Sequence, residues 1–103
     1  MKRYIIIKLL ILTSLLKSNQ FINGVDISML KQVEENGGLF YENGNQIDPI
    51  QLFKDNGINT ARIKIWHTPS LNYNNLESVL EIADRANSVG LDLLIDFHYS
   101  DTW

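Results

Sequence analysis

The sequence of 103 residues has no cysteine, two histidines and no cluster of basic residues beyond its first few positions. Without cysteine the chain can form neither disulfide bonds nor thiolate metal sites, so a folded core must be held by packing alone. The formal net charge of −3 provides no positively charged face for nucleic acid. His67 and His98 have no metal-ligand spacing, so we expect no bound metal.

Glycine is also sparse, and its six residues form no phosphate-binding fingerprint. They fall where turns and helix ends are expected, so the sequence indicates no nucleotide cofactor, and we expect no cofactor of any kind. An apolar content of 45% with 20% charged residues is typical of a globular protein.

The first 20 residues differ from the rest of the chain. Lys2 and Arg3 precede an apolar run from Tyr4 to Leu16, which only Lys8 interrupts. A basic head followed by about a dozen apolar residues is typical of a secretory signal and is short for a membrane span of about 20 residues. We therefore expect a secreted or periplasmic protein without a stable membrane span. An uncleaved anchor and a buried strand are the alternatives.

From residue 21 onward, predicted strands alternate with predicted helices. The Asn43-Gly44 pair between apolar flanks predicts a local hairpin. The order strand, helix, strand, helix, strand with short connections favours parallel strands joined by right-handed crossovers. The expected strands are residues 21–28, 59–66 and 91–99, and the expected helices are residues 29–38, 48–57 and 74–90.

Two helices carry detailed signals. Asp48 is the expected N-cap, Pro49 takes the first helical position, and Gln51 stands where a capping box has its third residue. In the later helix, Glu81 and Arg85 are spaced to pair across one turn. Its expected apolar stripe consists of Leu76, Val79, Leu80, Ala83 and Ala86.

Each predicted strand has one aliphatic face, which suits packing against helices, and one face that becomes polar toward its carboxyl end. Parallel α/β folds place their sites at these ends. A buried Arg62 requires an acidic neighbour, either Asp96 or a group beyond residue 103. For Asp96 alone we favour a structural role, and a lone histidine such as His98 is more often a rim residue than a catalyst. The polar face consists of Asp26, Ser28, Arg62, Lys64, Trp66, Asp96 and His98.

Four motifs resemble, in order and spacing, the N-terminal segment of glycoside hydrolase family 53, the arabinogalactan endo-β-1,4-galactanases. They are GVDIS, VEENGGLFYENGNQIDPIQLFKDNGIN, ARIKIW and DFHYSDTW, and the resemblance runs from Phe21 to Trp103. It implies a (β/α)8 barrel and retaining hydrolysis of the galactan side chains of pectin. The expected fold class is therefore α/β, as an incomplete N-terminal part of about three βα units of that barrel. Residues 1–20 would be the signal segment and residues 21–103 part of the catalytic domain.

The resemblance also implies roles for single residues. Arg62 matches the arginine that lies near the nucleophile and helps to hold a carboxylate ionised. His98 matches a histidine that lines the same cleft, and Asp26 matches an aspartate that supports the cleft floor. The expected substrate-binding residues are Trp66 and Trp103, which could stack on sugar rings or pack at the rim, and Asp101.

One position departs from the family pattern, because Lys64 stands where a second arginine is usual. A lysine cannot reproduce the two-pronged hydrogen bonding of an arginine. The contacts that this arginine organises in the family are therefore expected to differ here.

Retaining hydrolysis needs two carboxylates about 5 to 5.5 Å apart. In the resembling family these are glutamates on strands four and seven, so we expect both catalytic residues beyond Trp103 and an inactive isolated fragment. The partner expected for the whole enzyme is β-1,4-galactan or arabinogalactan. The alternatives are a related mannanase or cellulase-like glycanase, and a non-catalytic remnant that binds galactan through its tryptophans.

Overall fold

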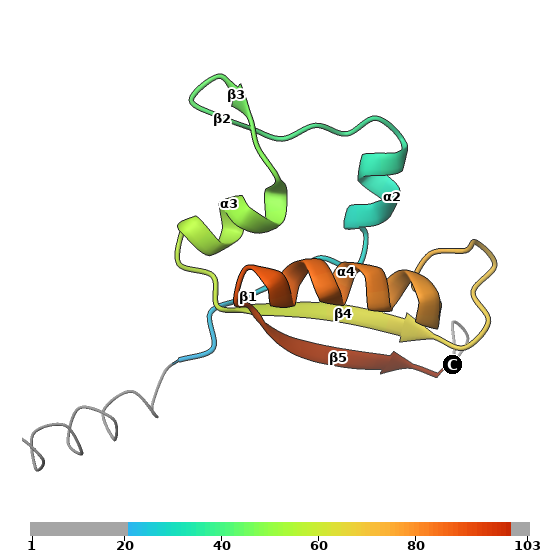
Figure 1. Ribbon diagram of the computed structural model, residues 1–103. Helices are drawn as coiled ribbons and strands as arrows, with labels where there is room; N and C mark the ends of the chain where they lie inside the picture. The colour runs from blue at the N-terminus through green and yellow to red at the C-terminus, as the bar shows by residue number, and fades with distance from the viewer. Residues whose placement is uncertain (1–20, 100–103) are drawn as a thin grey trace, which may run out of the picture.

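The computed structural model describes residues 21–99 of the chain. A parallel sheet has the order β1-β4-β5, and a separate two-stranded antiparallel sheet pairs β2 with β3. Figure 1 shows the three helices and the hairpin above the parallel sheet. The predicted order of elements is confirmed. The bounds are β1 Gly24–Asp26, α2 Leu30–Glu35, β2 Tyr41–Glu42, β3 Asn45–Gln46, α3 Pro49–Asp55, β4 Thr60–Trp66, α4 Leu76–Ser88 and β5 Asp92–His98.

Local signals account for the connections between β1 and β4. Asn43 and Gly44 have φ angles of 51° and 80°, as the type I′ turn of a tight hairpin requires. Asp48 caps α3 by accepting a hydrogen bond from the Ile50 N–H at 2.8 Å. Both predictions are confirmed. Gln51 does not close a capping box, however, because its side chain donates to Asp55 one turn later.

The hydrophobic core lies between the parallel sheet and the helices. Ile50 of α3 and Ile63 of β4 are its largest fully buried side chains, and each is at most 1% exposed. Deleting such a buried side chain down to alanine costs about 2 to 5 kcal/mol in other proteins. The buried apolar residues are Ile27, Leu30, Ile50, Ala61, Ile63, Val79, Ile82, Ala86 and Leu91.

The apolar stripe predicted for α4 is partly wrong. Val79 and Ala86 are buried as expected, but Leu76 and Leu80 are 62% and 56% exposed. Ile82, which the predicted stripe omitted, is buried at 4% exposure. The face of the helix that meets the sheet is therefore rotated about the helix axis from the predicted face. The rotation is less than the angle of about 100° between successive residues.

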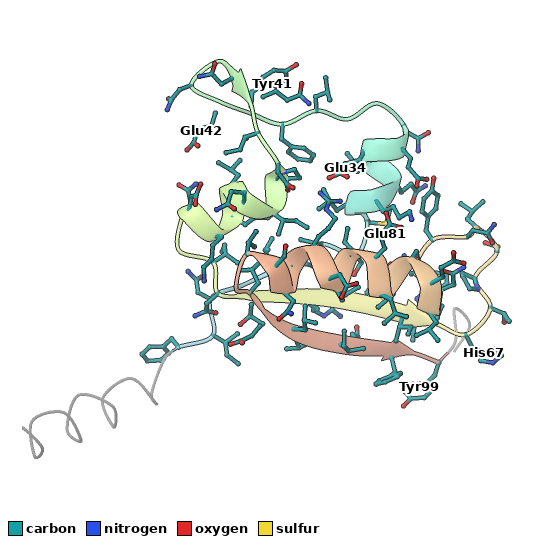
Figure 2. All side chains as sticks on the ribbon, in the orientation of Figure 1. Glu34, Tyr41, Glu42, His67, Glu81 and Tyr99 are labelled. Carbon is teal, nitrogen blue, oxygen red and sulfur yellow. The ribbon has the colours of Figure 1, made fainter. Side chains whose placement is uncertain are left out.

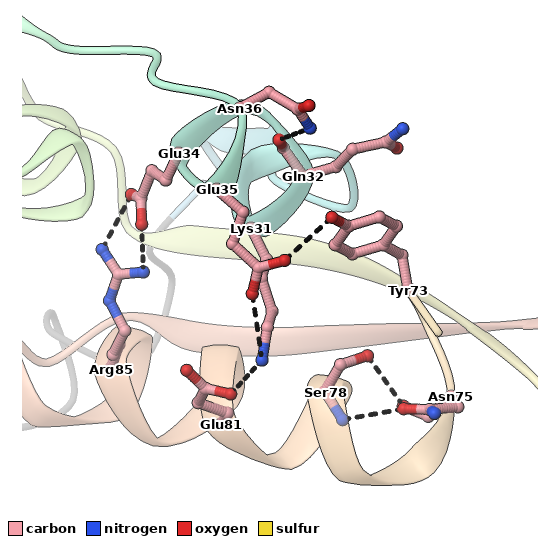
Figure 3. A network of polar contacts seen from close by, with 10 residues as sticks. All are labelled: Lys31, Gln32, Glu34, Glu35, Asn36, Tyr73, Asn75, Ser78, Glu81 and Arg85. Atoms are coloured by element: carbon pink, nitrogen blue, oxygen red, sulfur yellow. Dashed lines mark hydrogen bonds and ion pairs between the residues drawn. The ribbon is translucent and has the colours of Figure 1, made fainter. Parts of the chain in front are cut away.

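The pair predicted between Glu81 and Arg85 does not form. Glu81 instead contacts Lys31 of α2, and Arg85 makes two hydrogen bonds with the Glu34 carboxylate at 2.9 and 3.0 Å. Figure 3 shows these contacts between α2 and α4, together with the hydrogen bond that Tyr73 donates to Glu35. The charged side chains of α4 thus contact α2 and do not pair with each other.

The aliphatic face of the sheet is covered unevenly. Ala61 and Ile63 on β4 are fully buried, whereas Leu93, Ile95 and Phe97 on the edge strand β5 are 40%, 37% and 62% exposed. The expectation that helices cover this face thus holds for β4 and not for β5 within residues 21–99. In the same range no helix is long and apolar enough to cross a membrane.

Candidate functional site

Arg62 lies at the centre of a charged cluster on the polar face of the sheet. One terminal nitrogen of its guanidinium donates to Asp26 on β1 and the other donates to Asp96 on β5. The cluster thus joins all three parallel strands. The predicted acidic neighbour of Arg62 is confirmed at Asp96, which has the structural contact expected of it, and Asp26 is a second neighbour.

Asp26 is held as an anion by more than Arg62. Partial burial raises the pKa of its carboxyl, but hydrogen bonds from the Ser28 side chain and N–H and the contact with Arg62 together lower it by more, so the net shift is downward. The side-chain hydroxyl of Ser28 accepts a hydrogen bond from the Lys64 N–H at 2.8 Å. The GVDIS motif therefore both orients a carboxylate and fastens the end of β1 to β4.

Trp66 and His98, the last residues of β4 and β5, face each other in register. Their rings stack with centroids 4.5 Å apart and planes inclined by 25°. The Trp66 backbone N–H donates to the Asn74 carbonyl at 2.8 Å, so the loop of residues 67–75 folds back onto the strand end. The side-chain Nε1 of Trp66 is buried and has no hydrogen-bond partner within residues 21–99.

The loop of residues 67–75 and the β1–α2 turn enclose a groove beside this stack. Its volume is about 510 Å³, and Lys64, Trp66 and Tyr73 are among its lining residues. We call it the Lys64 groove. Asp26 and Ser28 of the predicted polar face also line it. Sequence reasoning missed its loop residues, Tyr73 among them, because the periodicity that identifies strands and helices says nothing about how a loop folds back.

The predicted site residues are thus partly brought together. Arg62, Asp26 and His98 lie on one face at the carboxyl end of the sheet, and Trp66 stacks on His98 there. Asp101 and Trp103 lie outside the described residues. The stacking was not predicted, although Trp66 ends one predicted strand and His98 is the next-to-last residue of another, so the register of parallel strands could have suggested it.

The glutamates of the described segment lie away from this face. Figure 2 shows Glu34 and Glu81 between α2 and α4, and Glu42 on the hairpin, far from His67 and Tyr99 beyond the strand ends. The remaining two glutamates, Glu35 and Glu77, also belong to α2 and α4. None of these five glutamates forms a carboxylate pair at the strand ends within residues 21–99. Those 79 described positions also contain no group of three or more side chains that could hold a metal ion.

Comparison with known proteins identifies relatives of this chain. The profile described as Glycosyl hydrolase family 53 matches residues 22–103. The chain is 36% identical over 92 residues to the arabinogalactan endo-beta-1,4-galactanase of Cellvibrio japonicus, covering 88% of this chain and 24% of that protein. It is 44% identical over 82 residues to the protein of the same name from Thermothelomyces thermophilus, covering 78% of this chain and 24% of that protein.

Solved structures agree. A fungal beta-1,4-galactanase superposes with a TM-score of 0.68 at 44% identity, over 78% of this chain and 24% of that one. The GH53 catalytic domain of Ignisphaera aggregans superposes with a TM-score of 0.71 at 37% identity, over 81% of this chain and 26% of that one.

The chain spans about a quarter of the length of the curated relatives that it matches. The predicted fold class is confirmed, since the parallel strands and their helices form an incomplete α/β unit that corresponds to part of the (β/α)8 barrel of these enzymes. The family match covers most of the sequence, and the chain therefore belongs to glycosyl hydrolase family 53.

Proposed function

We propose that the complete protein carrying this sequence is an endo-acting β-1,4-galactanase that cleaves galactan or arabinogalactan with retention of configuration. Family membership and relatives that are named arabinogalactan endo-beta-1,4-galactanases support the reaction. The observation that carries the proposal is Arg62, fixed between Asp26 and Asp96 on the face where such enzymes bind substrate.

In this proposal the role of Arg62 is electrostatic. A guanidinium held by two carboxylates keeps a fixed position, and a direct hydrogen bond from one of its remaining N–H groups would lower the pKa of a further carboxyl. A retaining nucleophile must be ionised before it attacks the sugar. Arg62 would therefore hold the nucleophile in its charged form, and Asp26 and Asp96 would hold Arg62.

The two catalytic carboxylates are then supplied from outside residues 21–99. Asp26 and Asp96 are unsuited to the task, because Arg62 occupies an oxygen of each and the lowered pKa of Asp26 makes it a poor proton donor. We propose that a 103-residue polypeptide of this sequence by itself hydrolyses no galactan.

The test is hydrolysis by the complete protein of a panel of β-1,4-galactan, mannan and cellulose. Release of galacto-oligosaccharides, with the β-anomer appearing first by proton NMR, is expected. Cleavage of mannan or cellulose alone would replace the proposal with a related glycanase, and an initial α-anomer would contradict retention. Galactan cleavage by the purified 103-residue chain would contradict its inactivity.

We also propose that residues 1–20 direct export and that residues 21–103 belong to the catalytic domain. Lys2, Arg3 and the apolar run after them support this assignment. N-terminal sequencing of protein recovered outside the cells checks it. A mature N-terminus near residue 21 is expected, and retention of the product in the cytoplasm would contradict export.

A further inference from the structure

Tyr73 connects two of the segments that follow the carboxyl ends of the parallel strands. It belongs to the loop of residues 67–75, which leads from β4 to α4, and its hydroxyl donates to the Glu35 carboxylate at 2.8 Å. Glu35 is the last residue of α2, which lies between β1 and α3. Figure 3 shows the tyrosine side chain reaching from its loop to α2. Since the substrate-binding loops of (β/α)8 barrels follow the carboxyl ends of the strands, this contact fixes two such segments relative to each other.

Glu35 is held in place by a second contact. The Lys31 ammonium lies 3.8 Å from one carboxylate oxygen of Glu35, and Tyr73 donates to the other oxygen, so neither contact displaces the other. Lys31 also contacts Glu81 of α4. The hydrogen bond to Glu35 raises the pKa of the Tyr73 hydroxyl, which therefore keeps the proton that it donates. A network of this kind holds its members in one geometry better than an isolated surface pair does.

Three successive residues fasten the end of the loop to three different elements. Tyr73 contacts α2. The Asn74 carbonyl accepts a hydrogen bond from the Trp66 N–H of β4 at 2.8 Å, and Asn74 has a left-handed φ angle of 63°. The Asn75 side chain caps α4 by accepting a hydrogen bond from the Ser78 N–H at 2.9 Å. Asn74 and Asn75 thus fix the loop to the strand and helix that it joins, whereas Tyr73 fixes it to the preceding part of the fold.

Tyr73 is one of the residues that line the Lys64 groove. Asp26 and Trp66 line it too, so the groove belongs to the cleft at the strand ends and is not a separate site. Within residues 21–99 Glu35 does not line the groove, so the hydrogen bond that holds Tyr73 is made outside it. A shift of Tyr73 would change the width of the groove, and small displacements of positioning groups are costly in enzymes.

We infer that the hydrogen bond between Tyr73 and Glu35 positions the loop of residues 67–75 for binding of the galactan chain. The inference rests on the proposed function for its substrate. Tyr73 and Glu35 are positioning residues, because they set the place of the loop and take no part in cleaving the glycosidic bond. The expected consequence is an effect on substrate binding and not on the chemical step.

The first test removes the hydroxyl of Tyr73 and keeps its ring. In the complete protein, Tyr73→Phe should raise the KM for soluble β-1,4-galactan about five-fold, the factor that corresponds to one typical hydrogen bond. Its kcat should stay at the wild-type value, because an interaction that supports substrate and transition state equally affects KM alone. Tyr41→Phe is the matched control, since Tyr41 lies on the hairpin strand β2, away from the groove (Figure 2), and its loss of a hydroxyl should leave KM unchanged.

A double-mutant cycle shows whether the two residues act as a pair. Glu35→Ala should raise KM by a similar factor, and the variant with both substitutions should have no higher KM than either alone. Glu35→Gln keeps an acceptor oxygen and should remain close to the wild-type KM. An unchanged KM in Tyr73→Phe, or multiplication of the two effects in the double variant, would overturn the inference. A fall in kcat at constant KM would also contradict it, since a loss of folded protein produces that result.

Hydrogen exchange separates this inference from the proposed function, because it needs no substrate. In Tyr73→Phe the amides of residues 66–75 should exchange faster, among them the Trp66 N–H that bonds to Asn74. Unchanged exchange would overturn the positioning role. Faster exchange in a protein that cleaves no galactan would support the loop contact and contradict the proposed function. Galactan cleavage with an unchanged KM in Tyr73→Phe would retain the proposed function and refute the inference.

Discussion

Two arginines in this chain have the same chemistry and different positions. Arg62 joins three strands by contacting Asp26 and Asp96, and Arg85 joins three helical elements by contacting Glu34 of α2 and Asp48 at the start of α3. Their side chains are similarly exposed, at 41% and 32%. Contact type and burial therefore do not distinguish a site residue from a structural one.

Position relative to the strand ends distinguishes them. The Arg62 cluster lies on the polar face beside Trp66, His98 and the Lys64 groove. Arg85 lies on the helical side, in the network between α2 and α4 that Figure 3 shows. The expectation is that loss of Arg62 affects catalysis and that loss of Arg85 affects stability.

The largest expected effect is on the activity of Arg62→Met in the complete protein. Its kcat on β-1,4-galactan should fall by roughly a hundred-fold or more, because a fixed charge at the reacting carboxylate is lost. Arg62→Lys should recover only part of it, since a lysine cannot hold both aspartates in the same geometry. Steady-state kinetics with circular dichroism as a folding control measures this. Activity that falls only in proportion to the folded fraction would assign Arg62 a structural role.

Arg85→Met is the matched variant on the helical side. The hydrogen bonds to Glu34 raise the pKa of the Arg85 guanidinium, so it is charged at all ordinary pH values. Removing the two-pronged pair should lower the free energy of unfolding by about 1 kcal/mol. Urea denaturation measures the loss, and kcat per folded molecule should not change. A large fall in kcat would erase the contrast between the two arginines.

Asp48 makes two contacts, a helix cap and an ion pair with Arg85, and two substitutions can distinguish their effects. Its carboxylate caps α3 at the Ile50 N–H and also lies 3.4 Å from Arg85. Asp48→Ala removes both contacts and should cost about 1 kcal/mol, as N-cap losses do. Asp48→Asn keeps a capping oxygen and should cost only a few tenths of that. Equal losses in thermal unfolding would show that the ion pair, and not the cap, fixes α3.

The smallest effect concerns the acid stability of the Arg62 cluster. The pKa of Asp26 is lowered in the folded protein, so the unfolded chain binds more protons in the acid range. The stabilisation is complete above the ordinary value of about 3.9 and is lost as the pH falls through the lower folded-state pKa. It should amount to less than about 1 kcal/mol for so exposed a group. The free energy of unfolding, measured by urea denaturation at several pH values between about 2 and 7, should depend less on pH for Asp26→Asn than for the wild type. An equal dependence on pH would contradict the assignment.

Local signals in the sequence predicted local structure well. Turn and cap chemistry at Asn43, Gly44, Asp48 and Pro49 was sufficient because each feature depends on residues within one turn. Strand alternation placed Arg62 on the polar face for the same reason. Its need for an acidic partner then followed from the cost of an unpaired charge.

Contacts between elements were harder to predict from the sequence. An isolated helix cannot show which of two overlapping apolar faces meets the sheet, so Leu80 was predicted inside and Ile82 was overlooked. Arg85 had a partner at the ideal helical spacing and still bonded to Glu34, 51 residues away. The loop fold that creates the Lys64 groove depends on the Asn74 carbonyl reaching back to Trp66, a contact without a sequence signature.

The parallel register also has a consequence for synthesis. Gly24 pairs with Thr60, and Thr60 pairs with Asp92, so each new strand reaches its neighbour only after more than thirty further residues. At ribosomal rates this delay is about 2 to 7 seconds, whereas a helix forms in microseconds. During translation α3 can therefore form before β4 is complete, and α4 can form before β5 is complete. Each strand waits unpaired for its successor, and rapid translation would shorten the period in which β1 and β4 are open to other chains.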